Sequence, residues 1–220
     1  MFTLSDEGVE MRAIYGKKLM MTRMFDKAGR SIPVTVLKVA ENIVTCEKTP
    51  EKDGYSAIQI GSGIKRHLNK PEQGHLAKSK AKSAKLIEVR TDKKYNIGDK
   101  ISLDIFEIGE DVNVTDVSKG KGFMGTVGRH NFNTGPKTHG SNNYRQPGSI
   151  GDTGPQRVVK GRRMAGHMGA EKVTVKNLAI IEINREKDQL ILRGAVPGPN
   201  KSGVLIWSKK ELEKEEADEA

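Results

Sequence analysis

A run of 53 residues, from 118 to 170, constrains the fold of this chain more than any other feature of the sequence. It holds 12 of the 24 glycines, and its apolar residues follow neither the helical nor the strand period. Unstructured loops of this length are uncommon in compact domains and are usually functional or disordered. Because glycine and proline alternate here with apolar and aromatic residues, unlike the monotony of a linker, the pattern favours a functional loop.

Positive charge is concentrated in the same segment. The whole chain of 220 residues has a formal net charge of +10 and a pI near 9.6. Residues 118–170 hold nine Lys or Arg and one Asp, and residues 65–90 hold eight Lys or Arg and two Glu, which leaves the remainder net negative. Ordinary solvated surfaces intersperse both signs. Two basic segments therefore predict a polyanionic partner rather than solvated faces without one.

The side chains of the loop are of the types that contact RNA. Lys and Arg neutralise phosphates, glycine lets the backbone approach closely, and imidazole and phenyl rings stack on unpaired bases. We expect RNA to order a segment this basic. The residues predicted to bind RNA are Lys119, Lys121, Arg129, His130, Lys137, Thr138, His139, Arg145, Arg157, Lys160, Arg162, Arg163 and His167, with Phe123, Phe132 and Tyr144 as further stacking candidates.

Outside the loop, the sequence predicts a mainly β fold. β-Branched, partly alternating runs are separated by Gly, Asp and Asn turn residues. They occupy residues 31–39, 42–48, 55–60, 101–105, 112–114, 172–175, 178–183, 189–192 and 204–207. We predict an antiparallel meander in the first part of the chain that forms a small barrel.

Residues 71–88 interrupt this strand pattern. Pro71 suits the first turn of a helix, and Ala, Lys and Leu dominate residues 77–86. We therefore predict a basic surface helix in an insertion at about residues 65–90. The predicted domains are a β-barrel body at 1–117 and 171–210, the loop at 118–170, and a solvated acidic tail at 211–220.

Sites of other kinds have weaker support. Residues 120–125 match GxGxxG, but no helical periodicity follows and the next acid is Asp152, so a dinucleotide site is not expected. The three loop histidines lack the cysteines and acids of a zinc site, and we predict no metal and no cofactor. A hydrolase set of Asp152, His139 and Ser141 exists on paper only, because nothing in the sequence fixes its geometry.

The remaining features indicate the compartment. The single cysteine, Cys46, lies in an apolar stretch and is interpreted as a core residue, and no internal disulfide is possible. No apolar run reaches the roughly 18 residues needed to cross a bilayer, and the first residues lack signal-peptide features. We expect a cytoplasmic protein, complete from its first residue, with no membrane partner and no small-molecule substrate.

Long motifs extend over most of the chain. In the loop they are residues 122–127, 138–141, 145–151 and 157–169 with Phe132 and Pro155, and outside it residues 16–22, 53–59, 70–75 and 194–198. These motifs resemble the bacterial form of the large-subunit ribosomal protein three family, the universal L-three family. The resemblance covers roughly residues 12–208.

This resemblance implies a translation-protein-like β-barrel with a small basic helical insertion and a long glycine-rich, basic loop extension. It implies direct binding to large-subunit ribosomal RNA, contact with neighbouring large-subunit proteins, a role in early subunit assembly, and no enzymatic activity. It also implies that the loop tip lies near the peptidyl-transferase centre. The tip residues would be Asn142, Ser149, Gly151, Asp152, Thr153 and Pro155. Gln156 follows the tip proline directly, so the glutamine methylation of some members is not transferred.

Two other functions remain as alternatives at this point. A free regulatory RNA- or DNA-binding protein could use the same charges, and it predicts a soluble pool outside ribosomes. An enzyme is the more distant alternative. It would require nucleotide-dependent protection of residues 120–125, or a reaction that is lost when Asp152 or His139 is replaced.

Overall fold

The structure is a computed structural model that describes residues 9–91 and 93–211. The described residues divide into two compact units, one from within 1–116 and 174–220 and the other from 117–173. The second unit begins one residue before the predicted loop and ends three residues after it. It is called the loop unit below, and the other is called the body. Apart from residue 211, the predicted acidic tail lies outside the described residues.

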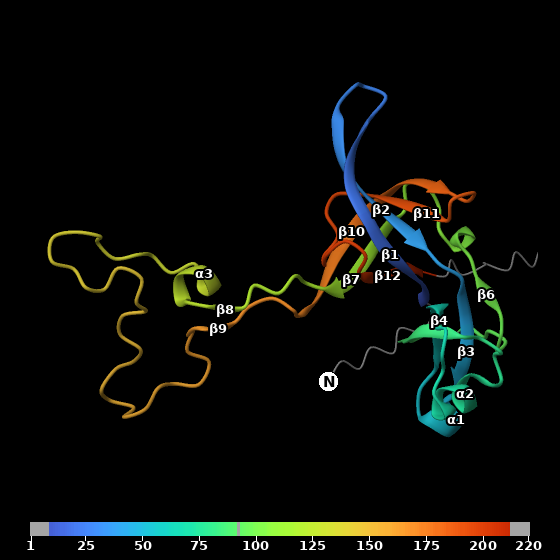
Figure 1. The fold of residues 1–220 in the computed structure, drawn as a ribbon, viewed down its shortest axis with the longest axis horizontal. Coiled ribbons are helices and arrows are strands. Elements are labelled where there is room, and N and C mark those ends of the chain that lie inside the picture. Colours follow the sequence, from blue (N-terminus) through green and yellow to red (C-terminus); the bar gives the residue numbers. More distant parts are fainter. Residues whose placement is uncertain (1–8, 92, 212–220) are drawn as a thin grey trace, which may run out of the picture. The chain divides into compact units, whose positions relative to one another are not determined.

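Six strands of the body hydrogen bond in a closed ring, in the order β1-β12-β7-β10-β11-β2 (Figure 1). The strands are β1 (Val9–Phe25), β2 (Ser31–Val39), β7 (Asp111–Val117), β10 (Lys172–Asn184), β11 (Gln189–Arg193) and β12 (Gly203–Glu211). They supply fully buried aliphatic side chains such as Ile14, Leu37, Val114, Leu190 and Ile206. Each such side chain contributes about 1.5–3 kcal/mol by leaving water. The prediction of a mainly β fold is confirmed.

A second sheet packs on the same hydrophobic core. Its strands β3 (Asn42–Lys48), β4 (Ala57–Ile64), β5 (Ser83–Val89) and β6 (Lys100–Ile101) are ordered β5-β4-β3-β6. Val44, Ile60 and Val89 join the core cluster that the barrel strands form. The short helices α1 (Pro50–Asp53) and α2 (Lys70–Leu76) connect strands of this sheet, and η1 (Leu103–Ile105) lies between β6 and the barrel strand β7. The predicted single meander is wrong here, because the chain leaves the barrel after β2 and β3 belongs to the other sheet.

The predicted helix over residues 71–88 is wrong for most of its length. Helix α2 spans only Lys70–Leu76, and Ser83–Val89 is strand β5, with Ile87 opposite Ile60 and Val89 opposite Ile58. Lys80 has a φ of 54°, which a continuing α-helix cannot accommodate. Helix propensity is worth only tenths of a kcal/mol per residue, so strand pairing and the burial of Val89 override it.

Cys46 is half-buried and is not part of the core, contrary to the prediction. The register between β3 and β4 shifts between Val44 and Cys46, as at a β-bulge. Both Val44 and Thr45 are buried as a result, and Cys46 falls on the more exposed side of the strand.

Candidate nucleic-acid interface

The loop unit begins with two chain segments, 118–124 and 166–171, that run antiparallel and are called the neck below. Backbone N–H groups of Ser118 and Lys121 donate to the carbonyls of Glu171 and Met168, each at 2.9 Å. Strand β8 (Phe123–Met124) pairs with β9 (Gly166–His167) at its end. The neck therefore holds together mainly by main-chain hydrogen bonds, with one further bond from the Glu171 N–H to the Ser118 hydroxyl.

Glycine is required where the two segments of the neck approach most closely. Gly169 has a φ of 76°, and a Cβ atom there would lie 2.2 Å from the carbonyl oxygen of Lys119. Both the backbone conformation and the contact exclude other residues at this position.

A short helix, α3 (Thr126–His130), follows β8 and is held by the returning chain. The Nη1 atom of Arg129 donates to the carbonyl oxygen of Met164 at 3.1 Å, and Nε2 of His130 lies 3.0 Å from the same oxygen. A Cβ atom on Gly166 would come within 2.4 Å of the Arg129 guanidinium, so this group packs directly on the glycine backbone. These contacts fix the two side chains in place.

Residues 131–165 contain turns and bends but no helix or strand. One turn is closed by the Gly135 N–H, which donates to the Tyr144 carbonyl at 2.8 Å, and the Lys137 ammonium lies 5.4 Å from the centre of the Tyr144 ring. Farther along, Nη2 of Arg162 donates to the Ser149 carbonyl at 2.8 Å. A few local contacts thus shape the loop, and most of its surface remains open.

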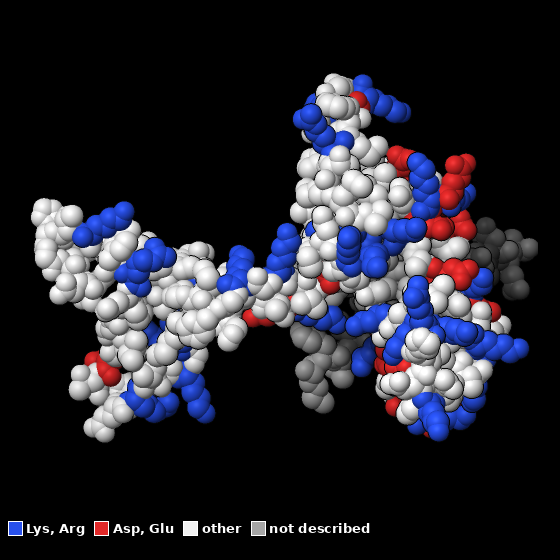
Figure 2. All heavy atoms as spheres, viewed as in Figure 1, with Lys and Arg blue, Asp and Glu red and all other residues white. Residues whose placement is uncertain are grey.

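The structure leaves most of the predicted RNA-binding side chains exposed; Arg129 and His130 are the half-buried exceptions. Within residues 117–173, all of which are described, none of the ten Lys and Arg side chains forms an ion pair, and the acids are Asp152 and Glu171. Figure 2 shows these Lys and Arg side chains spread over the visible face of the unit. The predicted tip residues are exposed as well: Asn142, Ser149, Gly151, Asp152, Thr153 and Pro155.

Five of the predicted residues come together at the neck, around a pocket of about 490 Å³. They are Lys119, Lys121, Arg129, His130 and His167. The imidazole of His167 also meets the Phe123 ring edge to face, with centroids 5.8 Å apart. Sequence reasoning missed Glu171 in this pocket and the carbonyl of Met164 that supports it, because no side-chain pattern marks a backbone acceptor. The other predicted cations lie farther along the loop, singly or, at residues 160–163, as a group of three.

Comparison with known proteins is decisive at this point. A family model described as Ribosomal protein L3 matches residues 70–196, more than half of the chain. The chain belongs to the ribosomal protein L3 family. It is 46% identical over 200 residues to the large ribosomal subunit protein uL3 of Pelotomaculum thermopropionicum, covering 89% of this chain and 95% of that protein. It is 47% identical over 201 residues to uL3 of an Exiguobacterium species, covering 90% and 97%.

Membership of the L3 family confirms the resemblance seen in the sequence. L3 proteins are structural components and not enzymes, so the enzyme alternative is excluded. One premise used against the GxGxxG motif was nevertheless wrong, since a helix does begin at Thr126, directly after the third glycine. That helix has only five residues, and the strand β8 lies within the motif rather than before it. The described residues contain no group of three or more His, Cys, Asp or Glu side chains that could hold a metal ion.

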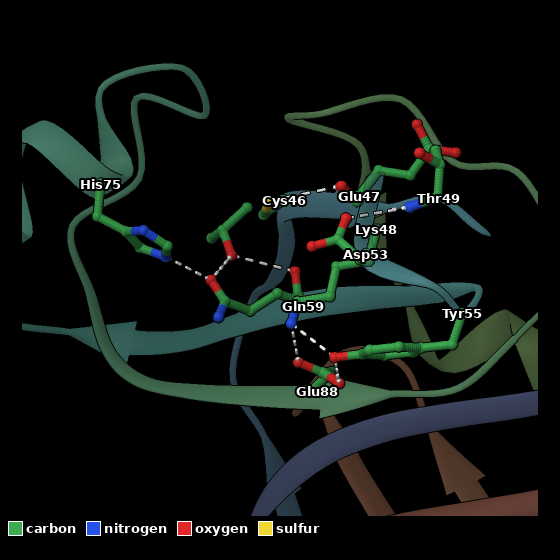
Figure 3. A network of polar contacts seen from close by, with 10 residues as sticks. Cys46, Glu47, Lys48, Thr49, Asp53, Tyr55, Gln59, His75 and Glu88 are labelled. Carbon is green, nitrogen blue, oxygen red and sulfur yellow. Dashed lines mark hydrogen bonds and ion pairs between the residues drawn. The ribbon is translucent and has the colours of Figure 1, made fainter. Parts of the chain in front are cut away.

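In the second basic segment, residues 65–90, one of the eight cations forms an ion pair with a described residue, and so do both of the acids. Lys65 forms an ion pair with Glu72 at 2.6 Å. Lys48 donates to the Tyr55 hydroxyl at 2.6 Å and lies 3.0 Å from the Glu88 carboxylate, and Tyr55 donates to Glu88 at 2.8 Å (Figure 3). The hydrogen bonds from Tyr55 and Lys48 lower the pKa of Glu88, and those to Tyr55 and Glu88 raise the pKa of Lys48.

A neighbouring group of hydrogen bonds ties helix α2 to the second sheet. Gln59 Oε1 accepts from the Thr45 hydroxyl at 2.9 Å and lies 2.7 Å from Nε2 of His75 (Figure 3). An amide oxygen only accepts, so Nε2 is the protonated ring nitrogen. His75 thus acts here as a structural contact.

Among the described residues, no helix is long and apolar enough to span a membrane.

Proposed function

We propose that this chain is a structural constituent of the large ribosomal subunit, in the bacterial cytoplasm, and that it binds the large ribosomal RNA directly through the loop unit. The observation that carries the proposal is the set of nine loop cations, eight of them exposed and none in an ion pair with a described residue. The relatives support it, because they are named large ribosomal subunit proteins.

Binding would be dominated by phosphate neutralisation. Each Lys or Arg that contacts a phosphate releases condensed counterions, which makes binding salt-dependent by about −0.7 to −0.9 in log K per contact. The cations occur singly or in small groups along the loop, and such spacing suits an RNA backbone that passes along the unit. Exposed Thr138 and His139 would add hydrogen bonds to phosphates and 2′-hydroxyls.

The finer assignment concerns the tip and the timing of binding. We place residues 142–155 near the peptidyl-transferase centre, where the chain would support RNA that performs the chemistry. Neighbouring large-subunit proteins would contact the body. A loop with so few internal contacts gains its final order from RNA, and this agrees with binding early in subunit assembly, before other proteins close the site.

Sedimentation of a cell lysate through a sucrose gradient tests the proposal. The chain should travel with the large subunit in about one copy and should resist a high-salt wash. A chain that stays near the top of the gradient would instead support the free RNA-binding alternative.

A deletion variant locates the interface. Residues 131–163 are replaced by a short Gly-Ser linker, which retains the neck, helix α3 with the Met164 carbonyl that holds it, and the body. Affinity for purified large-subunit RNA should fall, and the slope of log K against log salt should become shallower. An unchanged affinity and slope would contradict binding through this loop.

A further inference from the structure

The pocket at the neck has the size and lining of a ligand site. Its volume of about 490 Å³ lies within the range of roughly 300–1,000 Å³ that is typical of small-molecule pockets. All of its lining residues belong to the loop unit, and they include three cations, two imidazoles and one carboxylate. A phosphate contact alone needs neither such a volume nor aromatic rings, so the lining points to a ligand that carries both an anion and a planar ring.

The cationic side of the pocket is pre-organised. The hydrogen bond to the Met164 carbonyl and the packing on Gly166 hold the Arg129 guanidinium in place. That bond uses one of the five N–H donors of the side chain, and the others remain for a phosphate. Lys119 and Lys121 lie two residues apart in the neck and are exposed. Against these three cations the pocket has one carboxylate, that of Glu171, so it favours an anion.

The imidazole of His130 has a defined tautomer. Because the Met164 carbonyl only accepts, Nε2 of His130 carries the hydrogen atom. In the neutral ring, Nδ1 then holds a lone pair, which can accept from a 2′-hydroxyl or from an exocyclic base amine. The carboxylate of Glu171 is a second acceptor for base or ribose donors. Acceptors beside cations suit a nucleotide better than a simple anion.

His167 supplies a stacking surface. It is exposed, and its ring lies at 87° to the ring of Phe123. In an edge-to-face pair, each ring leaves at least one face of the other uncovered. Phe123 therefore leaves at least one face of the His167 ring open. Stacking on such a ring requires a base that has left its own stack. A base within a duplex cannot reach it.

From this geometry we infer that the neck pocket binds one unpaired nucleotide of the RNA, with its phosphate on Lys119, Lys121 and Arg129 and its base on His167. This inference rests on the proposed function for the identity of the partner, and it adds a single-nucleotide subsite within the RNA-binding surface. The rest of the loop would follow the RNA backbone without selecting unpaired bases.

Four forms of the full-length chain test this inference: wild type, His167→Ala, His167→Phe, and His67→Ala as a control in an exposed histidine of the body, outside the pocket. Affinity for purified large-subunit RNA is measured over a range of salt concentrations. We expect His167→Ala to weaken binding about tenfold with an unchanged salt slope, because stacking and not charge is lost. His167→Phe should restore affinity, and His67→Ala should bind at least several times more tightly than His167→Ala.

Chemical probing of 2′-hydroxyls in the same complexes identifies the nucleotide. Wild type should protect an unpaired nucleotide whose reactivity returns with His167→Ala and stays low with His67→Ala. The inference is overturned if no unpaired nucleotide depends on His167, if phenylalanine fails to rescue, or if the two alanine variants bind alike. Wild type that does not bind the RNA at all would overturn the proposed function as well, which separates the two failures.

Discussion

At the scale of single residues, the glycines of the neck matter for what they lack. Gly166 and Gly169 lie where a side chain would overlap the Arg129 guanidinium or the Lys119 carbonyl. By contrast, a Cβ atom on Gly148 would meet nothing within 4 Å, although Gly148 has almost the same φ of 75°. The abundance of glycine in the loop therefore combines two causes, close approach at the neck and turn conformation farther along.

Replacing Gly169 with Ala should open the neck. The substitution adds left-handed backbone strain of about 1–2 kcal/mol and a clash with the Lys119 carbonyl. Hydrogen exchange at the amides of Lys121 and Met168, which bond across the neck, should accelerate at least fivefold. Gly148→Ala is the control, since it carries the same strain without the clash and outside the neck. Equal exchange in the two variants would mean that the close approach at Gly169 is not required.

At the scale of elements, local sequence signals predicted hairpins better than they predicted which distant strands pair. The sequence indicated a hairpin around residues 184–188, and Asn184 does pair with Gln189 where β10 returns as β11. Nothing local distinguished residues 83–89 from a helix, because Ala and Lys favour helices in isolation. Their partners in β4 lie from 19 to 31 positions earlier in the chain. Contacts at this separation are invisible to periodicity.

Lys48, Tyr55 and Glu88 form a hydrogen-bonded group in the second sheet. The stability that this group contributes should fall in acid. The pKa of Glu88 is lowered below its ordinary 4.5, so its contribution to stability is present above pH 4.5 and is lost as the pH falls through the lower folded-state value. We expect the free energy of unfolding, measured in urea at pH 7 and at pH 3, to fall less between the two pH values in Glu88→Gln than in wild type. The difference should be small, because solvent screens a pair at the surface.

The control for this prediction is Glu51→Gln, in an exposed residue of α1 that has no ion pair with a described residue. It should keep the pH dependence of wild type. If Glu88→Gln also keeps that dependence, the hydrogen-bonded group of Lys48, Tyr55 and Glu88 does not contribute to the acid sensitivity of folding.

At the scale of the whole molecule, the two units differ in whether their charges form ion pairs. The loop unit carries its cations without ion pairs, whereas the body holds the paired charges of Lys65 with Glu72 and Lys48 with Glu88. Unpaired cations need not break an internal contact before they bind a phosphate. We therefore expect the salt dependence of RNA binding to arise mainly in the loop unit.

Neutralising four loop cations should therefore lower the salt dependence of RNA binding. The variant carries Arg145→Gln, Arg157→Gln, Lys160→Gln and Arg163→Gln, and it retains Arg162, whose hydrogen bond to Ser149 shapes the loop. If all four contact phosphates, the slope of log K against log salt should fall in magnitude by about 3. The matched control neutralises four exposed body cations, Lys27, Lys38, Lys52 and Lys187. A larger change in the control would assign the phosphate contacts to the body.

The sequence by itself determined the mainly β class and the family. These properties reside in local composition, alternation and long motifs, which the chain displays without folding. Only the tertiary structure decided that β3 leaves the barrel, that residues 83–89 form a strand, and that Cys46 is half-buried at a bulge. It also decided which predicted cations meet around the neck pocket, because that pocket depends on a backbone carbonyl at Met164 and on hydrogen bonds between segments more than 40 residues apart.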